Sequence, residues 1–329
     1  MQAMWIVLLR LSALGDVLRV LPAWKNLAEA FPGARIQAVV EDRHAFLLED
    51  LPSIEPVIVH RRRLSSPFRA FQELRRVAGL VRGADASLDF HGILKSALIP
   101  YFAGIGERWG DGRAKESAWL FQNNAVPFKR QSRYGQALGL SDAFGLSRGV
   151  AGLGQFTPAL KDTQLSPSGA WPTHIGSGRP RTLLVPGTSQ RGANKRWPLD
   201  RWIQLAEALK PERDMRWALG PAEKHLREWL PEESGVEALP ELPFWELATN
   251  MRSADRVIVG DTGLLHLAVL LGVQVTALLG PSDPVVSGIP PGTGTIVRAG
   301  TDCSPCRERR CLRRTCMELL RLDDVLAAL

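Results

Sequence analysis

The residues best suited to chemistry lie between 257 and 284, where the run D-T-G-L-L-H follows a short apolar stretch. Asp261 offers a carboxylate. Thr262 and Gly263 bring free backbone N–H groups to the start of a predicted helix, where phosphate binds well. His266 falls in the first turn of that helix. Each residue alone would be ordinary helix-start structure, but the whole run, followed by G-P-S-D-P, is more specific and indicates a ligand site.

The elements around this run predict a parallel α/β sheet. Residues 257–260 are apolar and short enough for a buried strand, residues 264–271 favour a helix that Gly272 ends, and residues 273–279 predict a second buried strand. Open α/β sheets bind ligands at the carboxyl ends of their strands, so we expect Asp261 at a ligand-binding edge.

A similar unit begins the chain. Residues 4–9 predict a strand and residues 17–31 a helix, with Asp16 at the end of the loop between them. Asp16 is either an ordinary N-cap or a carboxylate that faces a ligand cleft. The dinucleotide fingerprint G-x-G-x-x-G is absent from this loop, which disfavours a nicotinamide-dependent oxidoreductase.

A third strand, residues 181–186, leads into the run P-G-T-S and on to Lys195 and W-P. This loop is not a P-loop, because its lysine does not follow a second glycine directly. Taken alone, Thr188 and Ser189 are simply turn residues and Lys195 is a solvent-exposed side chain. Glu223 follows the predicted strand 215–219. Taken alone, it is explained as a glutamate in the first turn of a helix, where the helix dipole favours a negative charge.

The composition is basic, with a formal charge of +7 and a pI near 9.6. Such a charge favours anionic partners: nucleotide phosphates, nucleic acid or an acidic membrane surface. Arg61, Arg62 and Arg63 follow the predicted strand 57–60, so they form either a solvated face or a clamp for an anionic acceptor. The chain carries no known nucleic-acid motif, and we expect no nucleic-acid partner.

The length of 329 residues suits two domains. Residues 166–180 are rich in Gly, Ser and Pro and predict a linker between domains at 1–165 and 181–329. Arg10 and Asp16 interrupt any signal-peptide core. Residues 264–281 are better explained by helix, turn and strand than by a membrane span. We therefore expect a cytoplasmic protein.

All four cysteines lie near the C-terminus with the spacing C-x2-C-x4-C-x4-C, at Cys303, Cys306, Cys311 and Cys316. The first pair has metal-ligand spacing, so a structural zinc is one interpretation and an iron–sulfur cluster a weaker one. Four reduced thiols explain the residues equally well, and disulfides are less expected in a cytosolic protein. Residues 317–329 predict a closing helix.

The motifs together resemble glycosyltransferase family 9, the bacterial lipopolysaccharide heptosyltransferases. The resemblance rests on S-A-L-G-D-V-L, L-D-F-H-G-I-L-K-S, P-G-T-S…K-x-W-P and D-T-G-L-x-H…G-P-S-D-P. His91 stands where the family usually has Gln. V-V-E-D after the second strand makes the chain look closer to members that add the first heptose. The resemblance implies the GT-B architecture, two Rossmann-like α/β domains facing across a central cleft.

The resemblance also implies roles for the residues. Asp16 would be the general base of an inverting transfer. Lys95 and Ser96 would join the three arginines on the acceptor side. Residues on the donor side would be Thr188, Ser189, Lys195, Glu223, Asp261, Thr262, Gly263 and His266, with Glu223 on the ribose.

The implied donor is ADP-heptose, and the implied acceptor is an anionic lipid-linked sugar, Kdo-lipid A or heptosyl-Kdo. No cofactor is required for such a reaction, although a zinc at the cysteines would be structural. A lipid-linked acceptor suggests peripheral contact with the inner face of the cytoplasmic membrane. The alternatives are a GT-B transferase or epimerase acting on another nucleotide sugar and, more remotely, a basic nucleic-acid-binding protein with a zinc knuckle.

Overall fold

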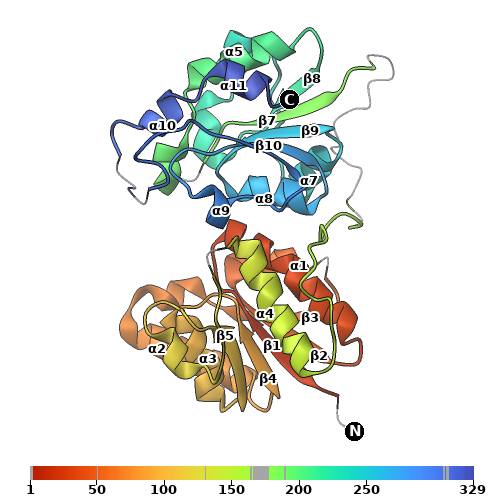
Figure 1. The fold of residues 1–329 in the computed structure, drawn as a ribbon, viewed down its shortest axis with the longest axis vertical. Coiled ribbons are helices and arrows are strands. Elements are labelled where there is room, and N and C mark those ends of the chain that lie inside the picture. Colours follow the sequence, from red (N-terminus) through yellow and green to blue (C-terminus); the bar gives the residue numbers. More distant parts are fainter. Residues whose placement is uncertain are drawn as a thin grey trace. The chain divides into compact units, whose positions relative to one another are not determined.

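A computed structural model describes residues 3–49, 51–129, 131–163, 165, 178–188, 190–306, 308 and 311–329. The chain divides into two compact units, Met1–Ala159 and Leu160–Leu329 (Figure 1). Residues just before the predicted linker already belong to the second unit, because the Leu160 N–H donates to Leu270 O at 3.0 Å. Most of the linker itself lies outside the described residues, so the predicted domain limits stay a prediction.

Unit 1 is built on a six-stranded parallel sheet with the order β3-β2-β1-β4-β5-β6. The central strands are almost wholly apolar, as expected of a sheet covered on both faces. The strands are β1 Trp5–Leu9, β2 Arg35–Glu41, β3 Ile54–Val59, β4 Ala86–Asp89, β5 Glu107–Asp111 and β6 Asn124–Val126.

Helices cover both faces of this sheet: α1 packs beside α4 on one face, and α2 packs beside α3 on the other (Figure 1). The helices are α1 Leu14–Ala30, α2 Pro67–Leu80, α3 Leu94–Ala103 and α4 Arg133–Ser147. Helix α4 was not predicted, since its glycines weaken the apolar periodicity, although Ser132 caps it by accepting from the Gly135 N–H at 2.9 Å.

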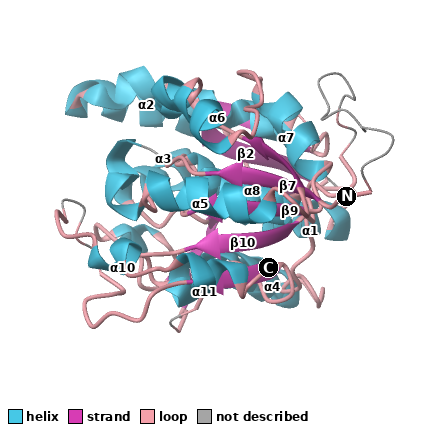
Figure 2. Cartoon of the chain, turned by 90° about the horizontal axis from the view of Figure 1, so that it is seen from above, coloured by secondary structure: helices cyan, strands magenta, loops and turns pink. Residues whose placement is uncertain are grey.

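Unit 2 contains a five-stranded parallel sheet with the order β11-β10-β9-β7-β8. Figure 2 shows helices flanking the strands. The strands are β7 Arg181–Val185, β8 Asp214–Trp217, β9 Arg256–Gly260, β10 Gln274–Leu278 and β11 Gly294–Val297. The helices are α5 Leu199–Leu209, α6 Trp229–Ser234, α7 Phe244–Arg252, α8 Gly263–Leu270, α9 Pro284–Ser287, α10 Thr315–Glu318 and α11 Leu322–Leu326.

Two predicted elements need correction. The closing helix is interrupted: it forms α10 and α11, which pack against the core around Trp197 and Trp202. Helix α1 begins three residues earlier than predicted, with Ala13 as its N-cap, so Asp16 lies inside the first turn and is not the N-cap. A carboxylate in the first turn is still favoured by the helix dipole.

Candidate active site

Three strand ends of unit 2 meet at Asp261. This residue follows β9 and is buried. Its Oδ2 forms an ion pair with Lys195 Nζ at 2.8 Å. Lys195 ends the 3₁₀ turn Gln190–Lys195 that follows β7. The hydroxyl of Ser282, which follows β10, donates to the same carboxylate oxygen. Neither pairing with Asp261 follows from the sequence pattern, although the run G-P-S-D-P is a signal for Ser282.

Arg196 connects two further predicted donor residues. Its Nε donates to Thr188 Oγ1 at 3.1 Å and its Nη2 to Thr188 O at 3.3 Å. The same Nη2 lies 3.6 Å from Glu223 Oε1. The Thr188 hydroxyl in turn donates to Gly192 O at 3.0 Å. Arg196 therefore ties the loop after β7 to the loop after β8. The sequence motifs alone did not identify Arg196 as a site residue. Ser189 lies outside the described residues.

Glu223 is held in a cradle that only glycine can line. A Cβ atom at Gly187 would lie 2.5 Å from Glu223 Cδ, far inside contact distance. Burial raises the pKa of Glu223 above its usual value, while Arg196 and the backbone N–H groups of Gly220 and Thr188 act in the opposite direction. Arg196 is therefore the charged partner of a carboxyl group whose ionised form burial disfavours.

A pocket of about 400 Å³ opens beside this cradle. Trp197 and Leu226 give it apolar walls, and Arg196 and Glu223 give it polar groups. Such a lining accommodates a ligand with both a flat apolar part and hydroxyl or anionic groups. Pro186, which directly follows β7, also lines it, so the pocket opens at the carboxyl edge of the sheet, where α/β folds bind ligands.

Thr262 is the N-cap of α8, and Gly263 is its first residue. The Thr262 side chain makes no capping hydrogen bond, so the first N–H groups of α8 are not satisfied by it. His266 lies one turn later and is buried. The structure thus places these three predicted residues on the same strand-to-helix turn as Asp261.

In unit 1, Asp16 lies among arginines from three segments. Arg10 Nη2 is 2.8 Å from Oδ2, and Arg19 Nη1 is 2.8 Å from Oδ1. Arg133 Nη1, from α4, is 3.8 Å from Oδ1. The Asp16 side chain remains 27% exposed, so it can meet a substrate. The arginines fix its orientation and also bring positive charge to the place where an anionic acceptor would bind.

The turn after β4 supports this loop. His91 Nδ1 accepts from the Leu11 N–H at 3.3 Å, and Arg10 Nη1 donates to Phe90 O at 2.8 Å. Burial, with Arg10 nearby, lowers the pKa of His91 to about 3, so its ring is neutral at physiological pH. A neutral ring that accepts at Nδ1 carries its proton on Nε2.

Asp89 organises the same turn from within the sheet. Its Oδ1 accepts from the His91 and Gly92 N–H groups at 2.9 and 3.1 Å, and its Oδ2 accepts from Ser96 Oγ at 2.9 Å. Burial nevertheless raises the pKa of Asp89 to about 6. Ser96 is fully buried, so its hydroxyl serves to hold Asp89 in place. Lys95 beside it is exposed. Their acceptor roles stay predictions.

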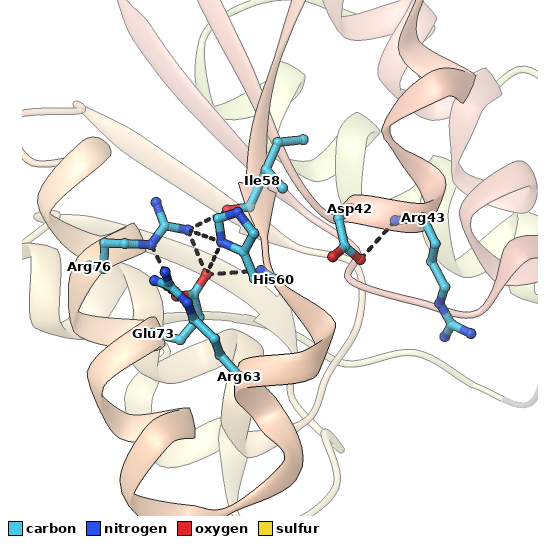
Figure 3. A network of polar contacts seen from close by, with 7 residues as sticks. All are labelled: Asp42, Arg43, Ile58, His60, Arg63, Glu73 and Arg76. Atoms are coloured by element: carbon cyan, nitrogen blue, oxygen red, sulfur yellow. Dashed lines mark hydrogen bonds and ion pairs between the residues drawn. The ribbon is translucent and has the colours of Figure 1, made fainter.

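The three-arginine run forms the 3₁₀ turn Arg61–Ser65. Glu73 of α2 anchors this turn from behind (Figure 3): its carboxylate accepts from Arg63 Nη1 at 3.0 Å and from the His60 N–H at 2.9 Å. Arg76 completes the network, donating from Nε to Glu73 at 3.0 Å and from Nη2 to Ile58 O at 2.6 Å.

The contacts of Glu73 separate Arg63 from the other two arginines of the run. These hydrogen bonds hold the pKa of Glu73 well below its usual range against the opposing effect of burial. Arg63 is committed to Glu73, whereas Arg61 is 3.9 Å from Glu41 and remains largely exposed, as does Arg62. The predicted clamp on an acceptor would then depend chiefly on Arg61 and Arg62.

The four cysteines are free thiols: Cys303 is exposed, Cys306 and Cys311 are half-buried, and Cys316 is buried. Burial raises the pKa of Cys316, and the other three thiols act in the same direction. Among the described residues, which include all four cysteines, no three His, Cys, Asp or Glu side chains are placed to hold a metal ion. The arrangement as it stands does not fit the predicted zinc.

Two parallel Rossmann-like sheets, with polar groups gathered at their strand ends, define the GT-B class of fold. The sequence profile of glycosyltransferase family 9 (heptosyltransferase) matches residues 69–316, and the chain belongs to that family. The predicted family and fold class are thereby confirmed. Among the helices of the described segments, none is both long and apolar enough to cross a membrane.

Relatives align over nearly the whole chain. Lipopolysaccharide heptosyltransferase 1 of Pseudomonas aeruginosa is 26% identical over 343 aligned positions, covering 98% of this chain and 91% of that protein. The structure of the Escherichia coli heptosyltransferase WaaC with ADP matches with a TM-score of 0.76 at 23% identity over 98% of both chains. A family 9 glycosyltransferase from Veillonella parvula matches with a TM-score of 0.78 at 17% identity, over 99% of this chain and 95% of that one.

Proposed function

We propose that this glycosyltransferase transfers a heptose from ADP-heptose to an anionic, lipid-linked sugar of the lipopolysaccharide inner core, with inversion at the anomeric carbon. The names of its relatives support the heptose and the lipopolysaccharide, and a bound ADP in one similar structure supports the adenine nucleotide. The observation that carries the proposal is a pocket at the carboxyl edge of the sheet that Glu223 and Arg196 line, with Thr188 bonded to Arg196. The ion pair of Lys195 with Asp261 lies on neighbouring loops.

In this proposal the donor's diphosphate lies at the N-terminus of α8. Backbone N–H groups there and the Lys195 ammonium stabilise the negative charge that develops as ADP departs. Glu223 binds ribose hydroxyls, and Arg196 holds Glu223 and Thr188 in place. The electrons of the breaking glycosidic bond leave with the ADP oxygen, and the acceptor hydroxyl forms the new bond.

Asp16 takes the proton from that hydroxyl as the new bond forms. Arg10 and Arg19 orient its carboxylate, and the cationic surroundings bind the acceptor's acidic groups. The transfer is proposed to take place in the cytoplasm, where a lipid-linked acceptor would bring the enzyme to the inner membrane face.

Calorimetric titration with ADP-heptose, ADP-glucose, UDP-GlcNAc and GDP-mannose tests the donor. Selective binding of the ADP sugars, weakened in Lys195→Ala, is the expected result. A preference for a UDP or GDP sugar would retain the transferase and reject heptose. Incubation with the donor alone, followed by analysis of the sugar, separates a transferase from an epimerase, since only the epimerase would isomerise the donor without an acceptor.

The predicted structural zinc now rests on cysteine spacing alone. Metal analysis of protein purified without chelator tests it directly. About one zinc per chain would establish the site. Four titratable thiols and no metal would leave the cysteines as free thiols.

A further inference from the structure

Helix α2 presents an apolar and cationic stripe to solvent. Phe68, Phe71 and Arg75 recur at a helical spacing of three and four residues, so they share one face. Phe68 is 70% exposed and Phe71 46% exposed, although the opposite face of α2 packs against the sheet through Leu74 and Val77. A soluble helix rarely leaves two phenylalanines uncovered beside each other.

The aromatic surface continues across α3. The Phe71 ring lies 5.6 Å from that of Phe102, Tyr101 follows at 6.0 Å, and Phe121 lies 5.0 Å from Tyr101. Phe121 belongs to the 3₁₀ turn Ala118–Phe121, which packs on α3. Further large side chains of this surface are also uncovered: Tyr101 is 50%, Trp119 49% and Leu120 60% exposed. We call Phe68, Phe71, Arg75, Tyr101, Trp119 and Leu120 the α2–α3 face.

Arginines dominate the charge of α2 and of the 3₁₀ turn before it. Residues 61–82 contain seven arginines and a single carboxylate, Glu73. That carboxylate is buried and pairs with Arg63 and Arg76, so the segment keeps a large excess of positive charge. The Arg75 guanidinium lies 5.8 Å from the centres of both the Phe71 and Phe102 rings, which joins the cationic and aromatic parts.

We propose that the α2–α3 face docks the enzyme on the surface of a bilayer that contains anionic lipid. Phenylalanine and leucine insert into the acyl boundary, Trp and Tyr favour the headgroup level, and arginines pair with anionic headgroups. A cationic rim around exposed aromatic side chains complements an anionic lipid surface in both charge and polarity. The α2–α3 face contains no residue assigned to the donor site or to Asp16, so this docking is independent of the proposed reaction.

Flotation with vesicles tests the proposal without acceptor, donor or turnover. Vesicles of phosphatidylethanolamine and phosphatidylglycerol in a 3:1 ratio are compared with pure phosphatidylcholine at 50 and 500 mM salt. We expect binding to the anionic vesicles at low salt and a large loss at high salt. Replacing both Phe68 and Phe71 by Ser should weaken partitioning at least about tenfold, because most of the insertion is lost.

Charge is tested separately with Arg69→Gln and Arg82→Gln, both exposed residues at the edge of the face. Each should weaken binding about fivefold, the effect expected of one basic residue at an anionic surface. Matched controls lie elsewhere: Leu146→Ser in α4, which is 57% exposed, and Lys210→Gln in unit 2. Both should bind as the parent does, and unchanged circular dichroism should show that every variant is folded.

Several results would overturn the docking proposal. One is the absence of vesicle binding at low salt; another is equal weakening by the control substitutions. A third is a stable dimer by light scattering that the Phe68 and Phe71 substitutions dissociate, since the face would then be covered by a second copy. Tighter binding of a single-stranded RNA oligonucleotide, with the same dependence on these residues, would assign the face to nucleic acid.

Discussion

The ammonium group of Lys195 lies 2.8 Å from the carboxylate of Asp261, so two predicted donor-site residues from different loops form one ion pair. The pair joins the loop after β7 to the end of β9, directly at the start of α8. In the proposed donor complex the diphosphate would meet a lysine that is already held in position, so less side-chain freedom would be lost on binding.

Substitution of this lysine should affect the donor specifically. Lys195→Ala removes a charged hydrogen-bond donor worth roughly 1.5–3 kcal/mol, so ADP should bind about 10- to 100-fold more weakly by calorimetry. Lys210→Ala is the control, because Lys210 is an exposed lysine at the end of α5. Unchanged ADP affinity in Lys195→Ala would remove this lysine from the donor site.

Substitution of Asp16 should separate chemistry from donor binding. Asp16→Asn keeps the size of the side chain but removes the proton acceptor, so kcat should fall by about 10² to 10⁴. The affinity for ADP should stay within about twofold of the parent. Glu29→Gln, an exposed carboxylate in the same helix, is the matched control and should retain full activity. If Asp16→Asn still transfers sugar at the parent rate, another group is the base.

A substitution at Gly187 should displace the side chain of Glu223. Gly187→Ala places a Cβ atom 2.5 Å from Glu223 Cδ, so the carboxylate must shift from its present position beside Arg196. We expect weaker ADP binding and a destabilisation of about 1–3 kcal/mol, the usual cost of overpacking. Gly33→Ala is the control, since a Cβ at Gly33 meets nothing within 4 Å. A variant that loses stability but binds ADP normally would show that Glu223 does not contact the nucleotide.

Asp89 should make stability depend on pH. Its folded-state pKa of about 6 lies above the unfolded value of 3.8, so between these limits the folded protein holds a proton that the unfolded chain has released. Its contribution to stability is therefore lost as pH rises through about 4 to 6. Asp89→Asn removes this titration and keeps acceptor oxygen for the His91 and Gly92 N–H groups.

The measurement is the difference in unfolding free energy between the parent and Asp89→Asn at pH 5 and pH 8. It should shift by roughly 1 kcal/mol in favour of the variant at the higher pH. Asp302→Asn, at an exposed position, should show no such shift. A difference that does not change with pH would mean that Asp89 titrates at its ordinary value in the folded protein.

The amino-acid sequence was enough to predict the alternation of buried strands and helices, the family, and the residues on the strand-to-helix turns. Those features are local: a strand of five apolar residues such as β1, or Asp261 directly before Thr262 and Gly263, depends on neighbours in the chain. Helix α4 was not predicted, because its glycines interrupt the local apolar pattern that identifies a helix.

Which of these residues contact one another is seen only in the folded structure. Arg196 on Thr188 and Glu223, Ser282 on Asp261, and Arg133 on Asp16 are pairings across different loops or helices. They depend on the order of strands in each sheet, because parallel strands gather distant loops at one edge. Buried polar groups must also find partners within the protein, so the hydroxyl of Ser96 donates to Asp89 and the buried carboxylate of Glu73 accepts from Arg63.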